Sequence, residues 1–199
     1  MLLRKYNLKL TEAGCDEAGR GSLVGPVFAA AVILPENFKA EGLNDSKKLK
    51  KKKREYLREI IENTAICYAV ATASREEIEK INVLNASTLA IHRALDQLKV
   101  RPDMILVDGN RFKPYQQIEY ACIVKGDGIY ESIAAASILA KTYRDSFMNR
   151  LHEEFPQYGW NHNKGYATRE HLQAIQKFGL TPYHRRTFKI SLQTRLSFD

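Results

Sequence analysis

The sequence has few cysteines and no long hydrophobic run. Its three cysteines, Cys15, Cys67 and Cys122, are widely spaced and odd in number. This excludes a disulfide scaffold and a zinc ribbon, and it fits a reducing compartment. The longest uninterrupted apolar run, residues 27–34, has eight residues, whereas a membrane-spanning helix needs about 20. The first ten residues show no apolar segment followed by a small-residue cleavage site. We therefore expect a cytoplasmic protein with no membrane contact.

Negative charge is also in the minority. The chain has 31 lysines and arginines against 23 aspartates and glutamates, which leaves a net charge of +8. A basic surface attracts polyanions, of which nucleic acids are the commonest. Charge alone fits a merely soluble basic protein equally well.

The 199 residues contain no internal repeat, low-complexity tract or linker rich in Pro, Gly and Ser. We therefore expect one domain over residues 1–199, with residues 190–199 as a candidate flexible tail, and a monomer. Short apolar segments bounded by Gly or Pro predict strands, at residues 26–34, 64–73, 103–107 and 118–124.

Helix patterns alternate with these strands. Asp45 and Ser46 resemble a cap for a helix that runs to about residue 63, and Ser74 with Glu77 forms a capping box. The box opens a short helix, and a longer one follows. Further helices are predicted over residues 130–155 and 168–179, the last capped by Thr168. The pattern predicts an α/β fold, with a mixed sheet and helices on its faces.

Four acidic residues occupy positions that a globular protein rarely gives to carboxylates. Asp16 and Glu17 precede a glycine-rich turn, Asp108 ends an apolar strand before Gly109, and Asp127 lies between two glycines. Carboxylates at strand ends of an open α/β sheet usually point into a functional crevice. If they converge, they repel one another unless a cation intervenes, and oxygen ligands select Mg²⁺ or Mn²⁺ over zinc. On a basic protein this set indicates metal-dependent phosphodiester hydrolysis. Taken singly, each acid would more often cap a helix or a turn.

The glycine-rich segment over residues 19–25 resembles a dinucleotide-binding loop only superficially. That loop requires a helix directly after it, whereas Pro26 and an apolar strand follow here. The sequence Lys125-Gly126-Asp127 is not a P-loop either. The turn Gly19-Arg20-Gly21 instead permits a close approach of backbone amides and one arginine to a sugar or a phosphate.

Two further residues are candidates for substrate contact. Lys47 follows Asp45-Ser46 in an expected turn, where its amine could reach a phosphate, while the rest of the basic run over residues 47–54 suits a solvated helix face. Tyr166 lies in a polar loop and could stack on a nucleotide, although loop tyrosines often simply pack. The five histidines show no metal-binding spacing, and we expect them at surface or loop positions.

The chain resembles the ribonuclease HII family. The resemblance begins at residues 16–21 (DEAGRG) and continues through 25–27 (GPV), 44–49 (NDSKKL), 107–110 (VDGN) and 125–127 (KGD). It then includes residues 132–141 (SIAAASILAK) and 162–171, and it ends at 184–186 (HRR). These motifs cover nearly the whole chain in the family's order.

The resemblance implies a ribonuclease H-like fold, a five-stranded mixed sheet flanked by helices, with a helical C-terminal part. It also implies hydrolysis of the RNA strand of RNA–DNA hybrids. A second implied activity is incision 5′ of single ribonucleotides in duplex DNA, leaving 3′-hydroxyl and 5′-phosphate ends. By motif position, the catalytic and metal-binding residues would be Asp16, Glu17, Asp108 and Asp127, with Mg²⁺ or Mn²⁺ as cofactor.

Other roles follow from the same resemblance. Gly19, Arg20 and Gly21 would contact the ribonucleotide, whose 2′-hydroxyl distinguishes RNA from DNA. Tyr166 would pack on the sugar at the junction, and Lys47 would contact a phosphate. Arg20 and the absence of an N-terminal extension favour type HII over the sister type HIII.

The C-terminal segment carries one more motif. Gln193, Leu196 and Phe198 resemble the short peptide by which bacterial replication proteins bind the sliding clamp. A frayed or packed terminus is the alternative, since short motifs often match by chance.

Two other functions remain open at this stage. A non-catalytic basic module would bind hybrids with a strong salt dependence but would cleave nothing when Mg²⁺ is added. A type HIII-like enzyme would cleave long hybrids but not a single ribonucleotide.

Overall fold

The computed structural model describes residues 2–47 and 49–188. Five strands form one mixed sheet in the order β3-β2-β1-β4-β5. β1 pairs antiparallel with β2 and parallel with β4; β2–β3 is antiparallel and β4–β5 is parallel. The strands are β1 (Glu12–Ala18), β2 (Val27–Ile33), β3 (Cys67–Ala73), β4 (Met104–Asp108) and β5 (Glu119–Ile123).

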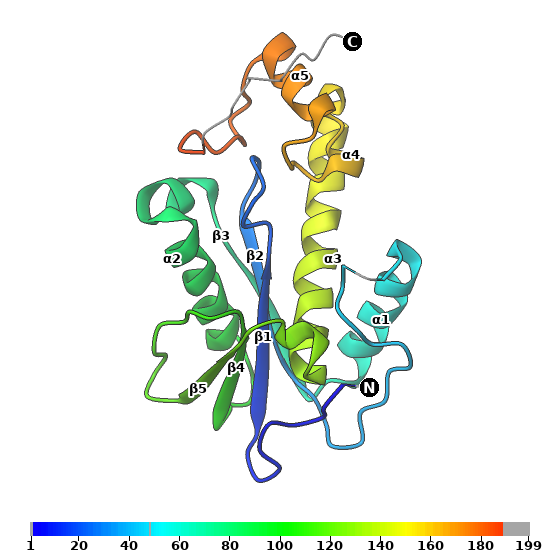
Figure 1. Ribbon diagram of the computed structural model, residues 1–199, viewed down its shortest axis with the longest axis vertical. Helices are drawn as coiled ribbons and strands as arrows, with labels where there is room; N and C mark the ends of the chain where they lie inside the picture. The colour runs from blue at the N-terminus through cyan, green and yellow to red at the C-terminus, as the bar shows by residue number, and fades with distance from the viewer. Residues whose placement is uncertain (1, 48, 189–199) are drawn as a thin grey trace, which may run out of the picture.

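Helices cover both faces of this sheet (Figure 1). α2 packs on β2 and β3 from one side, and α3 packs on β1 and β2 from the other, with α1 outside α3. The helices are α1 (Lys51–Thr64), α2 (Arg75–Asp96), α3 (Glu131–Glu154), α4 (Trp160–Asn163) and α5 (Arg169–Phe178), with single 3₁₀ turns η1 (Gly126–Gly128) and η2 (Pro156–Tyr158).

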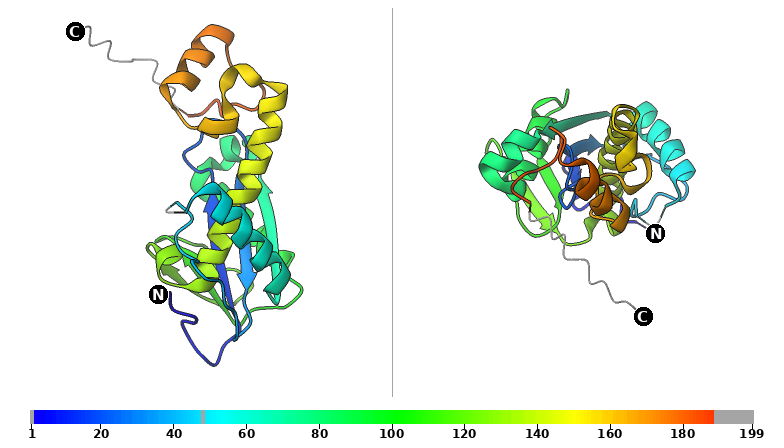
Figure 2. Two further views of the ribbon diagram at one scale, coloured as in Figure 1. Left: turned by 90° about the vertical axis from the view of Figure 1, so that its right-hand side faces the viewer. Right: turned by 90° about the horizontal axis from the view of Figure 1, so that it is seen from above.

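The predicted fold is therefore confirmed, including the helical C-terminal part. α3 is longer than the strands and continues past the end of the sheet, where its second half carries α4 and α5 (Figures 1 and 2). Within the described ranges, none of the helices combines the length and apolar character that crossing a bilayer requires.

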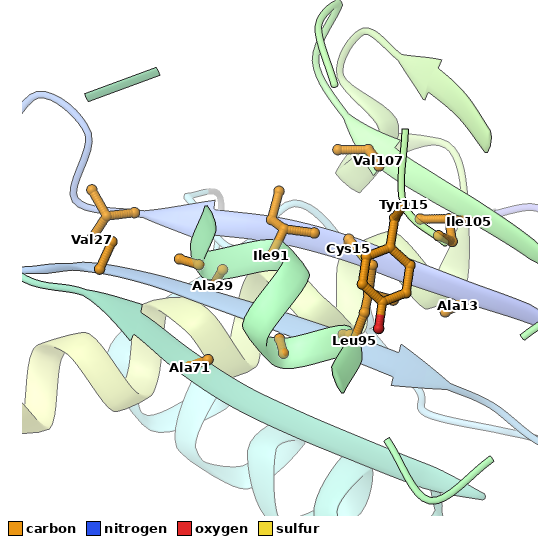
Figure 3. Close-up of a cluster of buried hydrophobic side chains, with 14 of the residues drawn as sticks. Ala13, Cys15, Val27, Ala29, Ala71, Ile91, Leu95, Ile105, Val107 and Tyr115 are labelled. Atoms are coloured by element: carbon orange, nitrogen blue, oxygen red, sulfur yellow. The ribbon is translucent and has the colours of Figure 1, made fainter. Parts of the chain in front are cut away.

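The main core lies between the sheet and α2. Small side chains on the strands, such as Ala13, Ala29 and Ala71, let α2 approach closely, and Ile91 and Leu95 of the helix fill the space above them (Figure 3). A second cluster fills the space between the sheet, α3 and α1. β2 and β4 are thus buried almost throughout, as strands with continuous apolar sequences are when both faces of the sheet are covered.

One glycine sets the distance between the sheet and α3. A Cβ atom on Gly14 would lie 2.2 Å from the backbone carbon of Ser132, in the first turn of α3. Only glycine permits this approach. The first turn of α3 is therefore pressed against β1, two residues before Asp16.

The helix from Ser74 has the predicted capping box, in which Ser74 and Glu77 bond to each other's backbone N–H groups. α2 is interrupted at Asn82, whose φ is 65° and whose Oδ1 accepts from the N–H groups of Leu84 and Asn85. The sequence predicted this division into a short and a longer helix.

The predicted start of α1 is wrong. The helix begins at Lys51, because the cap-forming side chains of Asp45 and Ser46 are used in the preceding turn. Asp45 Oδ1 accepts from the N–H of Lys47 at 2.9 Å, and the Ser46 hydroxyl pairs with that of Ser137 in α3 at 2.9 Å. This bond fastens the loop that carries Lys47 to α3.

Candidate functional site

The carboxylates of β1 and β4 meet because the two strands are parallel and in register. Cys15 lies opposite Val107 across the β1–β4 pair. Asp16 and Asp108 therefore follow at the same level of adjacent strands, and Glu17 continues β1 beyond them. Cys15 is fully buried in the strand.

Asp108 also positions the fourth acid. Its Oδ1 accepts a hydrogen bond from the N–H of Gly126 at 2.7 Å, which ties the end of β4 to the first residue of η1. Asp127 is the next residue and is 4% exposed. Three separate elements thus bring the four predicted acids to one region, where α3 begins.

The charges of these acids act on one another. Burial raises the pKa of Asp16 well above its ordinary value, and the nearby charges of Glu17 and Asp108 raise it further. Burial likewise raises the pKa of Asp127, followed by the charges of Asp108 and Asp45. Asp108 is common to both cases, so this region concentrates negative charge that the surrounding protein does not neutralise.

Two cations reach the edge of this cluster. Arg20 donates to Glu17 Oε1 at 2.9 Å; burial still raises the pKa of Glu17, with Arg20 opposing and Asp108 adding to the rise. Lys47 Nζ lies 3.8 Å from Asp127 Oδ2 while its side chain is 78% exposed. Burial works against the charged amine, but the carboxylates, Asp127 above all, raise the pKa of Lys47 overall.

A hard cation suits this donor set. The buried Oδ2 of Asp127 accepts no hydrogen bond from the described residues, and a buried oxygen of this kind normally has a partner. Among the described side chains, no three of His, Cys, Asp or Glu are grouped closely enough to hold an ion already. The acids therefore offer oxygen donors to a hard cation from β1, β4 and η1 without forming a closed set of ligands.

Two buried arginines contact the Gly19-Arg20-Gly21 turn. Arg185 donates to the carbonyl oxygens of Arg20 (2.9 Å) and Gly25 (2.8 Å). Gly19 has a φ of 95°, and a Cβ atom there would lie 2.2 Å from Nε of Arg144. The turn therefore needs glycine both for its backbone angle and for contact with this guanidinium.

Tyr166 lies beside the same turn. A Cβ atom on Gly21 would be 3.8 Å from Cε1 of Tyr166, and the guanidinium carbon of Arg144 is 5.5 Å from the centre of the Tyr166 ring. The ring is partly exposed, at 41% for the residue. Backbone bonds join the two loops, because the N–H of Leu23 donates to the carbonyl of Gly165 at 2.8 Å.

A cleft of about 470 Å³ opens next to the acids. Its wall includes Glu17, Arg20 and Asp108, and it continues past Arg111 and Lys113 toward the aromatic ring of Phe112. Carboxylates, cations and aromatic rings thus line the same cleft, a surface suited to a nucleic-acid strand.

Sequence reasoning missed several residues that shape this site. Arg144 and Arg185 were not singled out, although Arg185 lies in the HRR motif, and both are almost completely buried. The expectation that all histidines lie at the surface or in loops is wrong for His171, which is fully buried in α5. His184 lies in the segment after α5, but it is fully buried as well. The carbonyl groups that accept from Arg144 and Arg185 lie in distant parts of the chain, which single-residue patterns do not show.

The candidate clamp-binding residues, Gln193, Leu196 and Phe198, lie outside the described residues. The other predicted site residues lie in two neighbouring groups. The acids and Lys47 form one, and the glycine-rich turn with Tyr166 forms the other, with the Arg20–Glu17 ion pair between them.

Curated relatives and solved structures match this chain. A curated protein of Christiangramia forsetii named ribonuclease HII is 62% identical over 198 residues, covering all of both chains. A ribonuclease HII of Bacteroides fragilis is 63% identical over 190 residues, covering 96% of this chain and 94% of the relative.

Among solved structures, the ribonuclease H2 of Pyrococcus horikoshii has a TM-score of 0.75 at 26% identity, covering 90% of this chain and 94% of that one. The RNase HII in a complex with PCNA from Archaeoglobus fulgidus has a TM-score of 0.74 at 26% identity, covering 94% of this chain and 100% of that one. Bst-RNase HIII, solved with Mn²⁺, shares the fold at 19% identity with a TM-score of 0.70, covering 90% of this chain and 67% of that one.

The family model described as ribonuclease HII matches residues 13–198. This range contains all four acids, the glycine-rich turn and Tyr166. The interpretation as a non-catalytic binding module is therefore excluded. The chain belongs to the ribonuclease HII family, endoribonucleases that cleave the RNA of RNA–DNA hybrids and single ribonucleotides embedded in DNA.

Proposed function

We propose that Asp16, Glu17, Asp108 and Asp127 are the catalytic carboxylates and hold a divalent cation, Mg²⁺ or Mn²⁺. The observation that carries this proposal is the position of Asp108. It lies beside Asp16 in the sheet, binds the turn that presents Asp127, and its charge acts on the other three acids. The buried Oδ2 of Asp127, which accepts no hydrogen bond from the described residues, adds an acceptor for an ion.

A divalent ion bound there supplies Lewis-acid stabilisation of the charge that develops on a phosphate during hydrolysis. The protein supplies position. The register of β1 and β4 aligns two carboxylates, the Gly126 N–H orients Asp108, and Arg20 orients Glu17. Each of these contacts limits the movement of an acid at the cleft.

In this proposal, the glycine-rich turn and Tyr166 bind the ribonucleotide. Gly19, Arg20 and Gly21 bring backbone groups to the 2′-hydroxyl, which DNA lacks. The Tyr166 ring, adjacent to Gly21, packs against the sugar. Since deoxyribose offers no 2′-hydroxyl to this turn, DNA leaves its polar groups unpaired.

Lys47 contacts a substrate phosphate. Its amine is exposed and paired with Asp127 only at 3.8 Å, so it is free to exchange one anionic partner for another. Incision falls on the 5′ side of the ribonucleotide and leaves 3′-hydroxyl and 5′-phosphate ends.

The test is a nicking assay on duplex DNA that carries one ribonucleotide, with Mg²⁺ or Mn²⁺ and with Asp108→Asn alongside. Asparagine keeps an oxygen acceptor for Gly126 but removes the charge, so the fold persists while activity falls by about 100-fold or more. Full activity of the variant would contradict the role of the acids. Cleavage restricted to long RNA–DNA hybrids would favour the type HIII-like specificity instead.

We further propose that residues 1–199 form a single catalytic domain that acts as a monomer in the cytoplasm, where duplexes containing DNA occur in bacteria. Arg185, from the segment after α5, donates to the carbonyl of Arg20. Arg144 of α3 lies against Gly19 and donates to the carbonyl of Lys164 in the loop of Tyr166, so the C-terminal part completes the site. Light scattering that shows a stable dimer would contradict the monomer.

The C-terminal segment is proposed to bind the replication sliding clamp through Gln193, Leu196 and Phe198. The relative from Archaeoglobus fulgidus was solved in a complex with PCNA, which supports a clamp partner for this chain. Deletion of residues 193–199 should abolish binding to a purified bacterial clamp while nicking is spared, and Phe198→Ala should weaken it in the full chain. Unchanged binding after deletion would refute the proposal.

A further inference from the structure

A buried polar cluster lies in the C-terminal part, away from the acids. His171 in α5, His184 after it and Trp160 in α4 are each 0% exposed. Burying imidazoles and an indole N–H among aromatic side chains is costly unless their nitrogens find partners. Each buried nitrogen of these three residues has one.

The partners determine which nitrogen of each imidazole carries the proton. Trp160 Nε1 can only donate, and it donates to His171 Nε2 at 3.0 Å, so the proton of neutral His171 is on Nδ1. The N–H of Thr181 donates to His184 Nδ1 at 2.9 Å, which places the proton of His184 on Nε2. That N–H lies 3.3 Å from His171 Nε2, whose single lone pair it shares with the shorter hydrogen bond from Trp160.

The resulting chain of hydrogen bonds has one direction and ends at the predicted sugar-binding residue. His171 Nδ1 donates to the backbone carbonyl of Tyr166 at 2.9 Å. At the other end, the backbone of His184 forms a bridge with Val24, in the segment that follows the glycine-rich turn. The histidine pair therefore connects both halves of the proposed ribose site.

We propose that His171 is a positioning residue, which fixes the loop of Tyr166 against Gly21 through its Nδ1 hydrogen bond, with Trp160 and His184 setting its tautomer. The inference rests on the proposed function of Tyr166 as the sugar contact. His171 itself touches no substrate. Hydrophobic side chains of similar size in place of His171 and His184 would fill the same space. They would not donate to the Tyr166 carbonyl, and so they would not fix the orientation of the Tyr166 loop.

Two variants of His171 separate positioning from packing. In His171→Asn, the amide nitrogen occupies the place of Nδ1 and keeps the donor to Tyr166, but Trp160 loses its acceptor. In His171→Gln, the amide oxygen replaces Nε2 as the acceptor for Trp160, while the donor to Tyr166 is lost. If His171 had a purely structural role, the variant with the lower melting temperature would also have the lower activity.

The positioning role predicts that the two rankings differ. His171→Gln should lower kcat for single-ribonucleotide incision by about 10- to 100-fold with little change in KM, because small displacements of a contact strongly affect rate. His171→Asn should stay within about threefold of the unmodified enzyme, even where it melts at a lower temperature. Ile61→Val, a buried substitution in α1, is the control showing that lower stability alone leaves kcat unchanged.

The same variants in a Tyr166→Ala background complete the test. If His171 acts through Tyr166, the second change adds almost nothing to the loss caused by Tyr166→Ala. If Tyr166→Ala is impaired and the two substitutions reduce activity independently, so that their losses multiply, the positioning role of His171 is overturned while the proposed role of Tyr166 stands. Full activity of Tyr166→Ala overturns both this inference and the proposed role of Tyr166.

An independent readout is the ¹⁵N NMR spectrum of the imidazoles in the full chain. The geometry requires a proton on Nδ1 of His171, the less common tautomer of neutral histidine, and one on Nε2 of His184. A proton on His171 Nε2 would mean that no donor faces the Tyr166 carbonyl, and it would refute the inference.

Discussion

Replacing Asp108 with asparagine should make the protein more stable while it removes activity. In the unmodified protein, the N–H of Gly126 donates to Asp108 Oδ1 at 2.7 Å. Asparagine keeps an oxygen that can accept this hydrogen bond, so the turn before Asp127 is preserved. It removes the charge that raises the pKa values of Asp16, Glu17 and Asp127. In the absence of divalent ions, a source of repulsion among buried carboxylates is therefore lost.

The size of the effect follows from the strand geometry. Adjacent strands lie about 4.8 Å apart, and two unit charges about 6 Å apart repel by roughly 3 kcal/mol at an effective dielectric constant of 20. Lys47 and Arg20 offset part of this repulsion. We expect a net gain of about 1–2 kcal/mol, which for a chain of this length raises Tm by about 3–6 °C.

The assay is thermal unfolding with a chelator and again with saturating Mg²⁺. An ion at 100 times its Kd stabilises the native state by about 2.7 kcal/mol, so the unmodified protein should gain stability with Mg²⁺ and Asp108→Asn should gain little. Asp103→Asn is the matched control, since Asp103 also accepts from a backbone N–H, that of Thr11 at 2.9 Å, but lies before β4 rather than at its end. A lower Tm for Asp108→Asn in chelator, or an undiminished Mg²⁺ response, would refute the reasoning.

Three further perturbations test the packing around the site. Gly14→Ala should destabilise the protein by about 2 kcal/mol or more, because its Cβ atom would overlap the backbone of α3; a change below about 0.5 kcal/mol in urea unfolding would contradict the close approach. Burial, reinforced by the neighbouring His171, lowers the pKa of His184 to about 4. Between about pH 6.5 and 4 the unfolded chain therefore binds more protons at this residue than the folded protein does, and stability should fall by roughly 1 kcal/mol per pH unit as the pH decreases. A difference in unfolding free energy between the unmodified protein and His184→Gln that does not change with pH would exclude this contribution. Arg185→Lys removes the fork that bonds the carbonyls of Arg20 and Gly25, and it should cost about 2 kcal/mol and lower nicking more than the cleavage of long hybrids; equal losses on both substrates would argue against a role in shaping the glycine-rich turn.

Local patterns were sufficient to predict most of the fold. Continuous apolar segments gave β2 and β4 to within two residues, and the capping chemistry of Ser74 and Thr168 located the starts of α2 and α5. The same patterns failed at Asp45 and Ser46. There a good capping sequence serves a turn that bonds to α3, because the tertiary partner, Ser137, competes with the helix end.

The candidate site was predicted as a set of residues but not as a geometry. Asp16, Asp108 and Asp127 were recognisable because glycines and strand ends surround them. Their alignment depends on the register of two strands about 90 residues apart in sequence, which no local pattern specifies. Buried Arg144 and Arg185 escaped prediction for the same reason, since the carbonyl groups that accept their hydrogen bonds lie far away in the sequence.

The parallel pairing of β1 with β4 also bears on the order in which the proposed site is assembled during synthesis. β1, β2 and β3 follow one another in the chain and pair as an antiparallel unit, so they can associate early. One edge of β1 then stays unpaired until β4 has been made, and Asp127 emerges later still. Such long-range pairing slows folding and leaves an open strand edge on the growing chain. Under the proposed role of the four acids, we expect a ribosome-bound fragment that ends before β4 to carry Asp16 and Glu17 without nuclease activity.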